Sequence, residues 1–320
     1  MTSLLIEQVT FSATIQDAGR VGYLMDGITS GGAMDGFAHR LGQRLVGNPL
    51  TAACIEVALG GLKVTFGDCA YIALTGARCQ AMLNGEAIGQ DRTVFVPAGA
   101  KLEISGVSSG TYVYLSVSGG GFQTEKLLGS RSVVVRDGIG QPLTAGAAVP
   151  YKSTSTPLLC VHHRSDPRGK QPLDLRFLAG FHRHQATTQS INLLESGCFS
   201  VSNRRDRMAI AIDGDTVDTG ITGQWSEPTV AGAIQIPPDG RPLILMADRQ
   251  TVGGYPIMGA VLSPDCRRLS QATPGTPVVF RSVSESQAEQ ILWLERNYEH
   301  ELTLSTQTRL PLKARHVAYE

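Results

Sequence analysis

Short runs of apolar and β-branched residues, separated by turn-forming residues, dominate the first half of the chain. Turn clusters recur about every ten residues, which is the spacing typical of a β-barrel or β-sandwich. Asn84-Gly85 is the two-residue pattern of a tight β-hairpin. The pattern predicts strands over residues 4–9, 55–59, 62–66, 71–75, 93–96 and 111–117.

Helical periodicity is clear in only two segments. Asp35 is placed to cap a helix whose apolar positions within residues 37–45 share one face, and Gly47 is placed to end it. Residues 284–287 form a capping box before a second periodic segment, residues 288–298. We therefore expect a mainly β protein with a few short helices.

The chain changes character between residues 151 and 172, where a polar stretch precedes a charged stretch with two prolines. Such a composition is typical of a domain linker. We expect an N-terminal β-barrel-like domain over residues 1–155, a linker over 156–172, a C-terminal β-domain over 173–300 and a tail over 301–320. With 320 residues, the chain is long enough for two cores.

The charge balance argues against a nucleic-acid or membrane partner. Lys plus Arg equals Asp plus Glu at 28 each, and no strongly basic run occurs. No apolar run approaches the ~20 residues of a membrane helix, and the first residues do not resemble a signal peptide. The six cysteines include no C-x-x-C pair. We expect reduced cysteines and a cytoplasmic location.

The densest group of polar residues lies within residues 232–256. Two short apolar strands flank a Pro-Pro-Asp-Gly turn, and a polar bend follows the second strand. Asp248 comes directly after that strand, where partial burial would raise its pKa, so we expect it to be a catalytic acid or base. The residues expected to bind substrate here are Gln235, Gln250, Thr251, Gly253, Gly254 and Tyr255. Alternatively, the bend is a tight turn that satisfies its own backbone.

Three further polar groups are candidates for the same site. Asp17 is a second catalytic candidate beside Arg20, although the two can instead form an ion pair in a turn. Arg131 has the geometry to bind a carboxylate, but a solvated arginine is an equal alternative. Asp206 and Arg207 are candidate substrate ligands or a salt-bridged turn.

Common cofactor motifs are absent from the sequence. It contains neither a Walker loop nor a strand, G-x-G-x-x-G and helix unit, so we expect no ATP or dinucleotide to bind by those routes. His162-His163 and the His182/His184 pair lack acidic or cysteine partners at ligand spacing. We therefore expect surface histidines and no metal site.

The chain resembles the family of component C of prokaryotic 5-oxoprolinase, also called the biotin-dependent carboxyltransferase or allophanate hydrolase subunit 2 family. The resemblance implies two β-barrel-like domains of the cyclophilin-like type. It runs collinearly from about residue 4 to residue 281. The motifs that carry it are Gln16-Asp17-x-Gly19-Arg20-x-Gly22, Gly32-Ala33-Met34-Asp35, Leu45-Val46-Gly47-Asn48, Ala73-Leu74-Thr75-Gly76-Ala77, Leu128-Gly129-Ser130-Arg131-Ser132, Asp206-Arg207-Met208 and residues 232–256.

The resemblance implies one of three roles. The first is a subunit of an ATP-dependent 5-oxoprolinase, which opens 5-oxo-L-proline to L-glutamate, with ATP on a partner. The second is the carboxyltransferase of a urea or amide carboxylase, with biotin on a carrier, since this chain has no biotinyl motif. The third is a non-catalytic antagonist of a kinase inhibitor. All three imply a component B-type subunit as partner, and the first adds a component A-type subunit.

The chain departs from the family pattern at several positions. Val133-Val134 stand where the family usually has Thr-Asp, which removes a polar anchor and an acid. Gly36 and Ala231 each replace a proline. Asp17, Asp248, Gln250 and Tyr255 are unaffected. From the family resemblance and the polar residues of the candidate site, we expect the 5-oxoprolinase role with a small amide or urea-like substrate. The departures at Val133-Val134 keep the antagonist role open, and the carboxyltransferase role remains an alternative.

Overall fold

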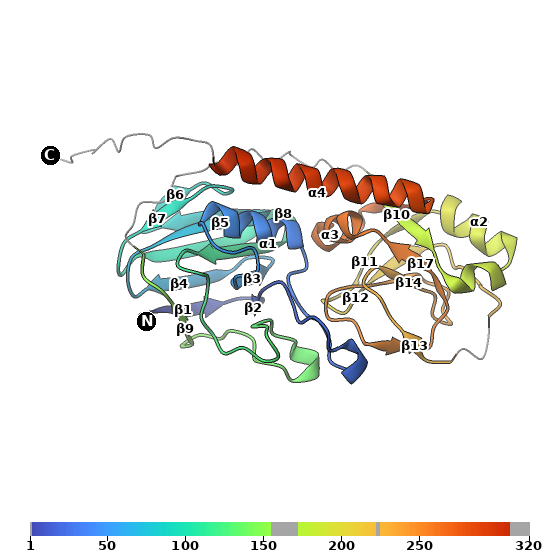
Figure 1. The fold of residues 1–320 in the computed structure, drawn as a ribbon, viewed down its shortest axis with the longest axis horizontal. Helices are drawn as coiled ribbons and strands as arrows, with labels where there is room; N and C mark the ends of the chain where they lie inside the picture. The colour runs from blue at the N-terminus through green and yellow to red at the C-terminus, as the bar shows by residue number, and fades with distance from the viewer. Residues whose placement is uncertain (1, 155–171, 222–224, 308–320) are drawn as a thin grey trace.

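Two β-units lie side by side, and one long helix crosses both of them (Figure 1). The computed structural model describes residues 2–154, 172–221 and 225–307. The N-terminal unit is a curved nine-stranded sheet, and the C-terminal unit is a closed seven-stranded barrel. The expectation of a mainly β fold built from two barrel-like units is confirmed. The linker expected over residues 156–172 lies outside the described residues apart from Pro172.

The N-terminal sheet has the order β2-β3-β8-β4-β1-β9, with β5 pairing β6, β7 and β8. Its apolar side chains form one core that includes Phe66, Ile72, Leu115 and Phe122. The hairpin expected at Asn84-Gly85 joins β5 to β6. The strands are β1 Thr2–Val9, β2 Ser12–Gln16, β3 Cys54–Ala58, β4 Leu62–Phe66, β5 Ala70–Leu83, β6 Glu86–Ile88, β7 Val94–Val96, β8 Lys101–Val117 and β9 Ala148–Tyr151.

The C-terminal barrel closes in the order β10-β17-β14-β15-β12-β11-β18. The rings of Phe177, Phe199 and Phe280 pack edge to face inside it. The hairpin expected from residues 232–247 is present as the antiparallel pair β14 and β15. The strands are β10 Leu173–Ala179, β11 Phe199–Arg205, β12 Ala209–Gly214, β14 Ala233–Gln235, β15 Leu243–Leu245, β17 Ile257–Val261 and β18 Pro277–Ser282. A separate pair joins β13 Glu227–Pro228 to β16 Val252–Gly253.

The helices begin where the caps predict. The Asp35 carboxylate accepts a hydrogen bond from the Ala38 N–H, and Ser284 and Gln287 form the reciprocal bonds of a capping box. Helices α2 and α3 were not predicted from the sequence. The helices are α1 Gly36–Leu45, α2 Thr188–Ser196, α3 Ser263–Gln271 and α4 Glu285–Gln307, with short 3₁₀ turns at η1 Leu24–Asp26, η2 Val135–Asp137 and η3 Phe181–Gln185.

Helix α4 corrects the expected start of the C-terminal tail. A tail was expected from residue 301, but the helix continues to Gln307. No Gly or Pro occurs between residues 285 and 307, so nothing in the sequence stops the helix at residue 300. Residues 308–320 lie outside the described part of the chain.

Candidate active site between the two β-units

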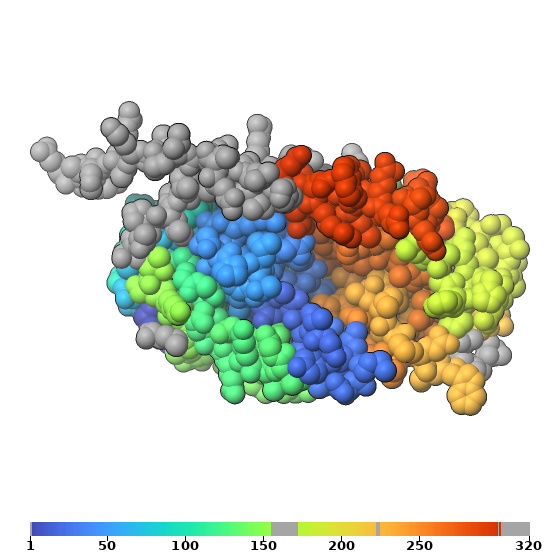
Figure 2. Space-filling view, viewed as in Figure 1, coloured from blue at the N-terminus to red at the C-terminus, as the bar shows by residue number. Residues whose placement is uncertain are grey.

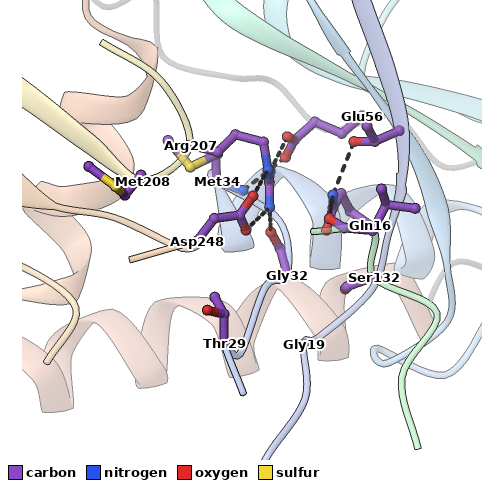
Figure 3. A network of polar contacts seen from close by, with 12 residues as sticks. Gln16, Gly19, Thr29, Gly32, Met34, Glu56, Ser132, Arg207, Met208 and Asp248 are labelled. Atoms are coloured by element: carbon purple, nitrogen blue, oxygen red, sulfur yellow. Dashed lines mark hydrogen bonds and ion pairs between the residues drawn. The ribbon is translucent and has the colours of Figure 1, made fainter. Parts of the chain in front are cut away.

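Arg207 binds two buried carboxylates that come from different halves of the chain (Figure 3). It lies in the turn between β11 and β12. Its Nε and Nη2 donate to the two oxygens of Asp248, each at 2.8 Å, which is a bidentate pair. Its Nη1 donates to Glu56, and Nη2 also donates to the Gly32 carbonyl at 2.6 Å. One guanidinium therefore ties β3, the loop before α1 and the bend after β15 together.

Glu56 was missed by the sequence reasoning. It lies in the middle of the otherwise apolar strand β3 and is 2% exposed. Its second oxygen accepts hydrogen bonds from the Met34 N–H and the Tyr114 hydroxyl, both at 2.8 Å. A single acid inside a buried apolar strand is rare unless it is paired. Its position in an apolar strand was therefore the sequence signal that could have identified Glu56 as a buried, paired carboxylate.

Burial raises the pKa of both carboxyl groups. For Asp248 and for Glu56, the charge of Arg207 offsets only part of this effect. Burial alone would lower the pKa of Arg207, but the two carboxylates raise it above its ordinary value. The network contains two carboxyl groups but only one guanidinium. It can therefore hold one proton that is free to exchange.

Asp17, by contrast, anchors a loop. Its carboxylate accepts hydrogen bonds from the Ser130 and Ser132 hydroxyls and from the Gly19 and Arg131 N–H groups, at 2.6–2.8 Å. Burial alone would raise its pKa, but these hydrogen bonds lower it below its ordinary value. The carboxylate is thus held in its charged form and fully engaged by the protein. The catalytic role expected for Asp17 stays a prediction that this geometry does not favour.

Arg20 and Arg131 bind backbone carbonyls of the same loop region. Arg20 donates to the carbonyls of Leu127, Thr29 and Ser132. Arg131 donates to the Thr124 carbonyl at 2.7 Å and to the Gln123 side chain. The ion pair considered for Asp17 and Arg20 does not form in the structure. Arg20 thus joins Thr29 to residues 127 and 132, the Arg131 side chain bonds to residues 123 and 124, and neither arginine joins the Arg207 network.

Asp206 also has a local role. It lies exposed in the turn before β12, where its carboxylate accepts the N–H groups of Met208 and Ala209. The neighbouring Arg207 points into the junction of the two halves, as described above. The structure therefore separates two residues that the sequence placed in one motif.

Gln235 and Gln250, which were both selected as substrate ligands, lie against each other. The Gln250 Nε2 donates to the Gln235 Oε1 at 3.5 Å. Within the described residues, the buried Gln235 Nε2 and Gln250 Oε1 have no hydrogen-bond partner. Gly253 lies so close that a Cβ built there would be 2.6 Å from the Gln235 Nε2. Of the remaining predicted ligands, Thr251 is half-buried, and Gly254 and Tyr255 are exposed.

A cavity of about 460 Å³ lies beside the Arg207 network. Figure 2 shows the recess between the N-terminal segment, in blue, and the barrel, in orange, beneath α4. Met34, which contacts Glu56, and the two neighbours of Asp248, Ala247 and Arg249, line the cavity. Glu56, Arg207 and Asp248 do not themselves line the cavity, so the polar network lies behind this part of the wall.

The histidines contribute no metal site in the described part of the chain. No group of three or more His, Cys, Asp or Glu residues with the geometry to hold an ion occurs there. The surface position expected for His182 is wrong, because its Nδ1 accepts the Ile257 N–H and the side chain is buried. His184 is exposed, and His162 and His163 lie outside the described residues.

The family of the chain follows from its sequence as a whole. The carboxyltransferase domain, subdomain A and B, matches residues 26–282. The chain belongs to this carboxyltransferase family. It is 30% identical over 284 residues to the C-type subunit of 5-oxoprolinase from Escherichia coli (strain K12), covering 86% of this chain and 89% of that one. It is 32% identical over 295 residues to the C-type subunit of 5-oxoprolinase from Haemophilus influenzae, covering 89% and 93%. The family resemblance inferred from the sequence motifs is confirmed.

The fold of this carboxyltransferase family member is shared with a solved protein of a yeast. The crystal structure of the Kluyveromyces lactis urea carboxylase matches with a TM-score of 0.84 at 22% identity. The match covers 97% of this chain but only 30% of that one. At this identity the likeness concerns the fold alone. Among the described helices, none has both the length and the apolar character needed to cross a lipid bilayer.

Proposed function

We propose that this chain is the C-type subunit of an ATP-dependent 5-oxoprolinase, which hydrolyses 5-oxo-L-proline to L-glutamate. The support is the 30–32% identity to two such subunits over most of the chain. The sequence has no phosphate-binding loop, so ATP would be bound by a partner subunit. A component B-type subunit, with or without a component A-type subunit, is the expected partner.

The observation that carries an active role is the Glu56–Arg207–Asp248 network. Opening the lactam adds water to the ring carbonyl carbon, breaks the C–N bond and transfers a proton to the leaving nitrogen. Two buried carboxyls with raised pKa values beside a cavity are suited to give and take that proton. We assign this role to Asp248, with Arg207 as the residue that positions it.

Gln235 and Gln250 are suited to recognise the amide. A lactam offers one N–H donor and one carbonyl acceptor, and the paired carboxamides have one acceptor and one donor without a partner in the described residues. Gly253, Gly254, Thr251 and Tyr255 complete the surroundings of this pair. Their contact with substrate is part of the proposal.

The test uses the full chain reconstituted with its A- and B-type subunits, ATP and 5-oxo-L-proline. We expect Asp248→Asn to lower kcat about 100-fold or more, because it removes the proton-transfer group. Asp213→Asn is the matched control: Asp213 is an exposed acid of the same barrel that pairs with Arg241 at 3.4 Å. Release of L-glutamate is measured, and size-exclusion chromatography checks assembly. Full turnover by an assembled Asp248→Asn complex would contradict the catalytic assignment.

The carboxyltransferase role is the second candidate, because the matching family is described as a carboxyltransferase domain. In that case the substrate would be a urea-like amide, and the carboxyl group would arrive on biotin carried by another protein. Avidin would then block turnover, whereas it leaves a 5-oxoprolinase unaffected.

A further inference from the structure

Arg249 is a buried cation that has no counter-charge among the described residues. Its side chain lines the cavity and is 7% exposed. In the described ranges, 2–154, 172–221 and 225–307, its Nε has no hydrogen-bond partner and its guanidinium forms no ion pair. The buried Arg20 and the half-buried Arg205 and Arg207 all bind carbonyls or carboxylates. An unpaired buried guanidinium is destabilising, which indicates that its partner is a ligand.

The other charged residues of the cavity wall are paired with one another. Arg40 binds Glu299, and Arg267 binds Glu295. All four of these residues and Arg249 line the cavity. Three cations face two anions, so the wall has an excess of one positive charge, and Arg249 carries it.

Two helix N-termini lie at the cavity wall, because helix α1 begins at Gly36 and helix α3 at Ser263. Each already has an acid, since the Asp35 carboxylate caps α1 and Asp265 lies in the first turn of α3. The helix dipoles therefore add no unbalanced positive charge to the wall. The rest of the wall is largely apolar, with Met34, Phe37 and Met246 among its residues.

The backbone of Arg249 is fixed from both halves of the chain. Its carbonyl accepts the Thr29 hydroxyl at 3.3 Å, and its N–H donates to the Met246 carbonyl at 3.3 Å. The guanidinium is thus presented to the cavity by a fixed main chain.

We infer that this cavity binds a small monocarboxylate and that Arg249 is the residue that binds its carboxylate. A ligand with one negative charge would balance the one excess positive charge of the cavity wall. The apolar side chains of the wall suit a ligand whose other atoms are compact and uncharged. The identification of the ligand as 5-oxo-L-proline, a lactam with one carboxylate, rests on the proposed function. The single negative charge of the ligand is inferred from the cavity wall and does not rest on the proposed function.

The test measures binding to the isolated full chain by titration calorimetry. The probes are 5-oxo-L-proline and 2-pyrrolidinone, which has the same ring without the carboxylate. We expect wild type to bind 5-oxo-L-proline at least about 10-fold more tightly than 2-pyrrolidinone. The reason is that 2-pyrrolidinone has no carboxylate with which to form a charged bidentate pair with Arg249. Arg249→Met should lose at least about 10-fold in affinity for 5-oxo-L-proline, and Arg249→Lys less. Arg241→Met, which removes an exposed arginine of the barrel, is the control and should bind as wild type does.

Thermal unfolding separates a binding role from a structural one. Because Arg249 makes no side-chain bond in the described residues, the free Arg249→Met chain should unfold at the wild-type temperature or above it. The rise in unfolding temperature that 5-oxo-L-proline gives to wild type should disappear. A variant that is less stable than wild type when free would contradict the inference, as would Arg249→Lys and Arg249→Met chains that bind with wild-type affinity.

Failure of the inference can be told apart from failure of the proposed function. Acetate, pyruvate and L-lactate are titrated in parallel. Binding of one of these, but not of 5-oxo-L-proline, with loss in Arg249→Met, supports the carboxylate site and overturns the proposed substrate. The absence of binding by all four monocarboxylates overturns the site.

Discussion

Asp17 and Asp248 show how surroundings decide the chemistry of one residue type. Both carboxyls are buried, and burial favours their neutral forms. Asp17 receives four hydrogen bonds from hydroxyl and N–H groups, which lower its pKa, whereas the single guanidinium beside Asp248 is shared with Glu56. Asp17 is therefore a fixed anion, and Asp248 is the better proton carrier.

We expect Asp17→Asn to destabilise the protein by about 2 kcal/mol at pH 7, because hydrogen bonds to a charged acceptor are weakened. The lowered pKa of Asp17 means that its stabilisation is present above the unfolded-state value near 3.8 and is lost as the pH falls through the folded-state pKa. Urea unfolding at pH 7 and at pH 3 should show a smaller difference between wild type and variant at pH 3. A difference that grows on acidification would contradict this account.

Sequence alone located some residues of the site but none of the links across the junction. Asp248 and Arg207 were both selected, yet their bidentate pair was not foreseen, since 41 positions separate them. Glu56 was missed because its partner Arg207 lies 151 positions away. Arg249 lies within residues 232–256 but was not selected as a site residue. The sequence does not reveal that its guanidinium is buried without a partner among the described residues, because that depends on the folded structure.

At the scale of elements, α4 acts as a brace across the two β-units (Figure 1). Glu299 binds Arg40 on α1, and Glu295 binds Arg267 on α3. The ring of Tyr298 stacks on Phe37 at 6.0 Å between centroids. One helix near the end of the chain thus contacts a helix from each half.

We expect Tyr298→Ala to destabilise the chain by about 1–2 kcal/mol, because it removes the stacked ring and its buried surface. Trp293→Ala is the control on the same helix. Trp293 is 61% exposed against 46% for Tyr298, and it stacks on no ring in the described residues. Its replacement should change stability by less than about 0.5 kcal/mol. Thermal denaturation measures both, and equal effects would argue against the brace.

Elements with local signals were predicted well, and elements held by distant contacts were not. The caps at Asp35 and Ser284 were read directly from the sequence. Helix α3 was missed because its sequence is mostly polar and lacks a clear apolar stripe. Its Asp265 instead pairs through two hydrogen bonds of 2.7 Å with Arg176 on β10. A tertiary ion pair of this kind leaves no local pattern.

At the scale of the whole molecule, the two units share one apolar core. Met34, Cys54 and Tyr114 from the N-terminal half pack in the same cluster as the barrel residues Phe177 and Ile210. The junction is closed further by the Gln271 carboxamide, which bonds the backbone of Thr111 and Tyr112 and the side chain of Asp35. The domain boundaries drawn from composition stay a prediction, but the two units are not packed independently.

We therefore expect the chain to unfold in one cooperative transition. Both tryptophans, Trp225 and Trp293, lie in the C-terminal half, so their fluorescence follows that half, whereas far-UV circular dichroism follows both. The two signals should give the same urea midpoint. Separate midpoints would show that the halves fold independently and that the shared core is weak.

The cavity is also completed only after helix α4 has been synthesised. Its walls come from residues 30–40, residues 231–267 and the α4 residues Glu295 and Glu299. A nascent chain that has emerged as far as residue 284 has all the strands of both sheets, but it still lacks the acids that pair with Arg40 and Arg267. On the ribosome, the cavity would therefore lack two of its negative charges at this stage, and its preference for a single carboxylate would arise only once helix α4 has emerged.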